Sequence, residues 1–194
     1  MNLLKAVFPV YEGLNMLKYL VIYASETGNT KKLAEEIYKA LPSPKKDKAL
    51  VDVRTWNGTL DAETYFIGFW ANRGSCTLEI IDILSSLNHR NIALFGTCGT
   101  GNEKEYYSLL EQNACVWISD NNNYLGSYFC QGKMADALKA KYESYRGKCD
   151  DEKLDQMMRI FDSAKNHPSR EDLQRAHQFV NNCCLQAKEL LFHV

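Results

Sequence analysis

Six consecutive residues combine hydroxyl and amide side chains with a glycine in an order that suits a phosphate group. They lie between an apolar run and a helical pattern. The first amides of that helix have no partner within it and carry positive partial charge, so they can bind a phosphate whose oxygens nearby hydroxyls complete. The segment predicts a phosphate-binding turn. Its members are Ser25, Glu26, Thr27, Gly28, Asn29 and Thr30.

Two better-known nucleotide patterns are missing from this chain. No lysine lies within the turn and the GxxxxGK[ST] pattern is absent, which argues against a P-loop NTPase. The GxGxxG pattern is absent as well, which argues against a dinucleotide-binding fold.

The elements around the turn alternate between strand and helix patterns. Such alternation implies parallel strands joined by right-handed crossovers, and therefore an α/β sheet. The polar region 145–168 is expected to form a surface excursion, and Ser169 is expected to cap a last helix. Four strands are expected at 19–23, 50–53, 65–70 and 92–95. Residues 116–118 are expected to form the fifth strand, with 128–130 as a second contributor to it. Helices are expected from Thr30 to Leu41, at 77–87, at 103–112 and from Ser169 onward.

The turn resembles, position by position, the [ST]-x-T-G-x-T phosphate loop of flavodoxins. The resemblance extends over about residues 16–190 and implies a three-layer, doubly wound, five-stranded parallel sheet with the order 2-1-3-4-5. It also implies flavin mononucleotide (FMN) as cofactor, with its phosphate held without a basic side chain. Residues 16–194 would form this flavodoxin-like FMN-binding domain, whereas 1–15 are expected to be a leader or a cloning remnant.

Two further loops should meet the phosphate turn, because ligands of doubly wound sheets bind at the carboxyl ends of the strands. The loop after the fourth strand is similar to the glycine-rich second flavin loop of flavodoxins. Later stretches at 129–133 and 167–173 resemble the end of the fifth strand and the last helix of that family. The candidate flavin contacts are Trp70, Ala71, Asn72, Arg73 and Gly74, then Thr97, Cys98, Gly99, Thr100 and Gly101.

These loops depart from the family pattern at the flavin ring. Flavodoxins usually stack aromatic rings on the flavin, yet Thr100 stands where the second loop commonly has one, and Arg73 stands where tryptophan or methionine is common. Trp70 either covers one face of the flavin or is a core residue at a strand end. Arg73 either stabilises the anionic reduced flavin or is a surface arginine. Cys98 is more simply a loop residue than a redox group, because no basic residue is adjacent.

Composition narrows the classes of partner. The 23 basic and 24 acidic residues give a net charge of -1, without the basic excess that nucleic-acid binding needs. Seven cysteines without CxxC or zinc spacing indicate reduced thiols in a cytoplasmic protein and no metal site. Residues 1–15 are too short to span a membrane.

Electron transfer is the function that these features favour first. The resemblance implies a protein that shuttles electrons to a larger redox partner protein. The alternative is an FMN-dependent oxidoreductase, or a reductase subunit, that passes hydride to a small molecule through an open flavin face. A near-neutral charge and the missing aromatic residue favour this alternative. No catalytic acid or base stands out near the loops, and the sequence leaves the oligomeric state open.

Overall fold

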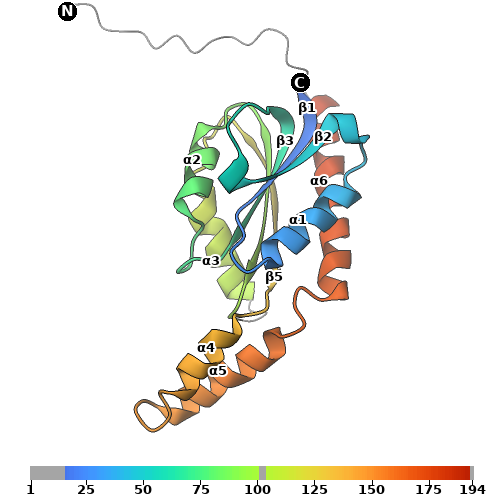
Figure 1. Ribbon diagram of the computed structural model, residues 1–194. Helices are drawn as coiled ribbons and strands as arrows, with labels where there is room; N and C mark the ends of the chain where they lie inside the picture. Colours follow the sequence, from blue (N-terminus) through green and yellow to red (C-terminus); the bar gives the residue numbers. More distant parts are fainter. Residues whose placement is uncertain (1–15, 101–103, 193–194) are drawn as a thin grey trace, which may run out of the picture.

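A five-stranded parallel sheet forms the centre of the protein (Figure 1). The computed structural model describes residues 16–100 and 104–192. Its strand order is β2-β1-β3-β4-β5, which confirms the predicted order and the α/β class. The strands are β1 Leu17–Tyr23, β2 Lys48–Asp52, β3 Ala62–Trp70, β4 Asn91–Cys98 and β5 Asn123–Gln131.

Helices cover both faces of the sheet and bury two apolar clusters (Figure 1). On one face, α1 (Asn29–Ala40) and α6 (Arg170–Phe192) pack side by side. On the other face lie α2 (Leu78–Ser86) and α3 (Lys104–Cys115). Because the inner strands are covered on both sides, they are nearly continuous apolar runs rather than alternating ones. Short 3₁₀ turns at Lys45–Asp47 and Val53–Thr55 flank β2.

The last helix begins as predicted from Ser169. The Ser169 hydroxyl accepts a hydrogen bond from the Asp172 amide at 3.2 Å, and the Asp172 carboxylate accepts one from the Ser169 amide at 2.7 Å. This reciprocal arrangement has the logic of a capping box. No helix among the described residues has the length and apolar content of a membrane span.

The fifth strand differs in part from the prediction. Residues 128–130 lie in β5, but Val116, Trp117 and Ile118 form turns after α3. The amides of Trp117 and Ile118 bond to the carbonyls of residues 114 and 115, and Val116 is 74% exposed. The apolar triplet was misleading because it ends a helix instead of entering the sheet.

The polar region 145–168, which was predicted to be a surface excursion, forms part of a helical hairpin that begins after β5. The hairpin consists of α4 (Asp136–Glu143) and α5 (Asp151–Ala164), which project beyond the carboxyl end of the sheet (Figure 1). Asp150 caps α5 by accepting hydrogen bonds from the amides of residues 152 and 153. Leu154 and Phe161 are buried, so the hairpin has an apolar side of its own.

Candidate functional site

The predicted phosphate turn connects β1 to α1. Gly28 adopts a left-handed conformation, with φ of 87°, and its amide donates to the Ser25 hydroxyl at 3.2 Å. The first bond of α1 runs from the Lys32 amide to the Gly28 carbonyl, so the amides of residues 29–31 precede the helical ladder. These amides and the helix dipole make the turn suitable for an anion.

Side chains of the turn are fixed by contacts with distant parts of the chain. The Asn29 side-chain amide donates to the Thr27 hydroxyl and to the Lys133 carbonyl, both at 2.8 Å. The buried Thr30 hydroxyl lies 3.0 Å from the Thr97 hydroxyl at the end of β4. The turn is therefore attached to the end of β4 and to the segment that follows β5.

A cavity of about 300 Å³ opens beside the turn. We call it the main cavity. The carboxyl ends of several neighbouring strands border it, as expected for the binding crevice of a doubly wound sheet. Its lining residues are Glu26, Thr27, Asn29, Trp70, Ala71, Thr97, Cys98, Gly99, Thr100, Gly132, Lys133, Met134, Ala135, Leu138 and Tyr142.

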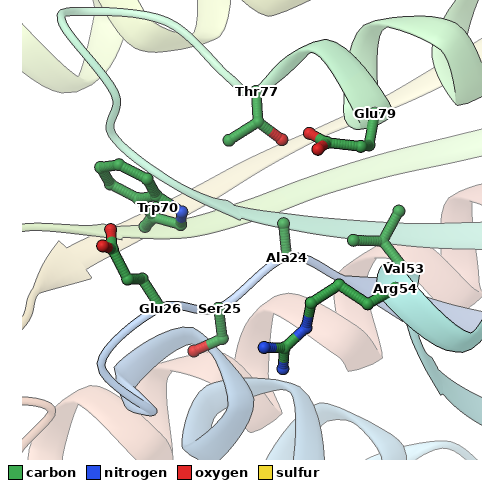
Figure 2. A pocket seen from close by; sticks show the side chains of 8 residues that line it. All are labelled: Ala24, Ser25, Glu26, Val53, Arg54, Trp70, Thr77 and Glu79. Atoms are coloured by element: carbon green, nitrogen blue, oxygen red, sulfur yellow. The ribbon is translucent and has the colours of Figure 1, made fainter.

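A second cavity of about 350 Å³, here called the side cavity, shares Trp70 and Glu26 with the first. Figure 2 shows Trp70 next to Glu26, with residues at the start of α2 on one side and Arg54 on the other. Arg54 forms an ion pair with Asp52, and the hydrogen bond from its guanidinium is the main cause that lowers the pKa of that carboxyl group. The lining residues are Ala24, Ser25, Glu26, Val53, Arg54, Trp70, Thr77 and Glu79.

Most of the predicted cofactor contacts converge on these two cavities. Gly28 shapes the turn, and Gly101 lies outside the described residues. Asn72, Arg73 and Gly74 are not among the lining residues of either cavity. The predicted residues that line at least one cavity are Ser25, Glu26, Thr27, Asn29, Trp70, Ala71, Thr97, Cys98, Gly99 and Thr100.

The loop after β3 ends in a tight two-residue turn. Residues 72 and 75 exchange two backbone hydrogen bonds, and Arg73 and Gly74 between them have φ of 52° and 84°. Two left-handed residues at the centre define a type I′ turn. The Asn113 side chain of α3 donates to the Gly74 carbonyl at 2.8 Å and holds the turn in place. Arg73 itself is exposed.

This exposure predicts that Arg73 would have a small effect on the reduction of a flavin bound in the main cavity. A charge 4 Å from the ring in water contributes only about 1 kcal/mol, and less when salt screens it. In the FMN-loaded protein, Arg73→Ala should destabilise the anionic reduced flavin by no more than this free energy. The reduction potential should therefore fall only slightly. Arg73→Glu should lower it further. Redox titration of the three proteins checks this, and a larger shift would indicate that the guanidinium reaches the ring.

An aromatic cluster joins α3 to strands β3 and β5. The Tyr107 ring stacks on Phe129 at 6.1 Å between centroids, and Phe129 meets Phe69 edge-on at 5.5 Å. Burial, with a smaller contribution from nearby Cys98, raises the pKa of Tyr107 above its usual range. Tyr107 thus stays neutral and packs within the core, which leaves Trp70 as the ring from the predicted loops that lines the cavity.

Most of the cavity wall that follows β5 was not predicted from the sequence. This wall consists of Gly132, Lys133, Met134, Ala135, Leu138 and Tyr142. The segment 129–133 resembles a stretch of flavodoxins, but that resemblance ended before the helix that follows it. The apolar spacing at positions 135, 138 and 142 was the signal that could have predicted it, since these positions share one helical face.

Comparison with known proteins gives the family. The flavodoxin domain model matches residues 20–181. The flavodoxin-like domain-containing protein BilS of Clostridioides difficile strain CD3 is 33% identical over 175 residues, covering 88% of this chain and 98% of that protein. The chain therefore belongs to the flavodoxin domain family.

Solved structures show the same fold. A flavodoxin of Streptococcus pneumoniae TIGR4 superposes with a TM-score of 0.56 at 16% identity, covering 87% of this chain and 98% of that one. A flavodoxin from the domain Archaea superposes with a TM-score of 0.55 at 15% identity, covering 89% and 99%.

Proposed function

We propose that this protein binds FMN in the main cavity and shuttles electrons to a larger redox partner protein. The observation that carries the proposal is the phosphate turn, which opens at the cavity that Thr97 to Thr100 also line. Bound FMN would supply reversible one- or two-electron transfer through its ring.

The residues of the turn fit a terminal phosphate. The amides of residues 29–31 offer donors at the positive end of the dipole of α1. Thr27 accepts the hydrogen bond from Asn29, so its own O–H is the group left to donate to a phosphate oxygen. The Asn29 side-chain amide bonds to both the Thr27 hydroxyl and the Lys133 carbonyl, and so holds Thr27 in place next to the segment after β5. The chain thus supplies amides and a hydroxyl where a P-loop protein would use a lysine.

The lining of the main cavity favours electron transfer over acid–base catalysis. Among its described lining residues, Glu26, Cys98, Lys133 and Tyr142 carry titratable groups, and none is a histidine. The Lys133 ammonium lies 3.3 Å from the Asp136 carboxylate. Such a lining can position a flavin without providing a paired acid and base.

Cys130, Cys149 and Cys183 are free thiols, which supports a cytoplasmic location.

The purified protein should carry FMN and not FAD. The turn offers one anion site at the start of α1, and the chain has no dinucleotide pattern. Flavin released by heat and separated by chromatography should elute with FMN. For apoprotein, titration with each nucleotide should show tighter binding of FMN. Recovery of FAD, or equal affinity for the two nucleotides, would contradict the proposal.

One observation favours the alternative of an FMN-dependent oxidoreductase or reductase subunit. Thr100, in the loop after β4, is exposed and offers no aromatic cover to the site. An uncovered flavin face would admit a small hydride acceptor. Photoreduction of the FMN-loaded protein separates the two functions: a stable one-electron-reduced state supports the shuttle, and direct two-electron reduction supports the alternative.

A further inference from the structure

One face of α4 is directed at the main cavity. Ala135, Leu138 and Tyr142 line the cavity and follow a spacing that places them on one side of a helix. Another side of the same helix packs on α5. There the Lys139 ammonium lies 6.0 Å from the centre of the Phe161 ring and 3.8 Å from the Asp162 carboxylate. The helix thus has one side committed to packing and another that borders the site.

The hairpin is fixed to the phosphate turn and to the end of β4. The Lys133 carbonyl accepts the bond from Asn29, and the Lys133 amide donates to the His167 carbonyl at 2.9 Å. The buried side-chain amide of Gln131 lies 3.2 Å from the Ser163 hydroxyl and 3.4 Å from the Gly99 carbonyl. These contacts place the base of α4 relative to both loops before any ligand binds.

We propose that Tyr142 packs against the isoalloxazine ring of bound FMN. This proposal rests on the proposed function, and it assigns to α4 the aromatic contact that Thr100 does not provide. Tyr142 is half-buried and lines the same cavity as Thr100 and Trp70. Contact between aromatic rings is favourable beyond simple burial. Because a stacked ring also changes the surroundings of the flavin, flavin fluorescence is a second readout of this contact. The helical hairpin therefore forms part of the cofactor site.

The test uses the full chain and four variants, each titrated with FMN while flavin fluorescence is followed. Tyr142→Ala and Tyr142→Leu should bind FMN roughly 3- to 10-fold more weakly and quench it less than the wild type. Tyr142→Phe retains the ring and should restore both properties. Tyr145→Ala is the matched control, since Tyr145 is 44% exposed and lies beyond the end of α4, outside the cavity lining.

The outcomes separate this proposal from the proposed function. Wild-type affinity and quenching in both Tyr142→Ala and Tyr142→Leu would overturn the role of Tyr142 and leave FMN binding intact. An equal loss in Tyr145→Ala would also overturn it, because the effect would then belong to the hairpin in general. A folded wild type that binds no FMN would overturn the proposed function and the role of Tyr142 with it.

Discussion

Replacing Thr27 with alanine should weaken FMN binding roughly 10- to 100-fold while leaving the free energy of unfolding nearly unchanged. Thr27 is exposed in the phosphate turn, and its oxygen accepts the bond from Asn29. The variant loses a hydroxyl donor to a charged phosphate, and such a bond contributes roughly 1.5–3 kcal/mol. Titration calorimetry with FMN measures the loss, and thermal unfolding of the apoprotein measures the stability.

Thr30→Ala should behave differently, because Thr30 is 1% exposed and pairs with the Thr97 hydroxyl. Its removal leaves a buried hydroxyl without that partner, which costs roughly 1–3 kcal/mol of stability. Thr30→Ala should therefore lower both the affinity for FMN and the unfolding temperature of the apoprotein, whereas Thr30→Ser should keep both close to the wild type.

Thr59→Ala is the matched control for these variants. Thr59 is an exposed loop threonine whose hydroxyl donates to the Asn57 side chain at 2.7 Å, so the same atoms are removed away from the site. It should bind FMN as the wild type does. Unchanged affinity in both Thr27→Ala and Thr30→Ala would place the phosphate elsewhere.

The fold could be predicted because its inner strands are buried on both faces. The structure confirms the strands that were predicted at 19–23, 65–70 and 92–95, which lie in β1, β3 and β4. Each is a continuous apolar run, as expected for a strand that helices cover on both faces. The strand–turn–helix arrangement around residues 25–30 could be predicted as well, because these residues are contiguous and lie between a buried strand and a helix.

The rest of the site depended on information that is not local. Trp117 belongs to an apolar triplet that is typical of a strand, yet it lies in a turn after α3. Arg73 was predicted to contact the cofactor from the first flavin loop, but it lies in the type I′ turn at an exposed position. Tyr142 is far from the loops in sequence and lines the cavity because α4 follows β5 at the carboxyl end of the sheet. Tertiary contacts decided each of these positions.

Gly132 provides the second large expected effect, because it lies where the phosphate turn and β4 meet the end of β5. Its amide donates to the Cys98 carbonyl at 2.8 Å. A Cβ atom at this position would lie 3.1 Å from both the Asn29 side-chain nitrogen and the Thr97 Cβ. Contacts this short require the neighbours to move, and Thr97 is buried and paired with Thr30. Asn29 is therefore the residue that must yield.

Gly132→Val should consequently weaken FMN binding more than tenfold, with Gly132→Ala intermediate. Overpacking of this kind costs roughly 1–3 kcal/mol, and a displaced Asn29 loses its bonds to Thr27 and Lys133. FMN titration gives the affinities, and circular dichroism checks that the sheet is intact. The double variant with Asn29→Ala tests the route: if valine acts by displacing Asn29, the two losses will not add. Additive losses, or wild-type affinity in Gly132→Val, would show that Gly132 does not control the phosphate turn through Asn29.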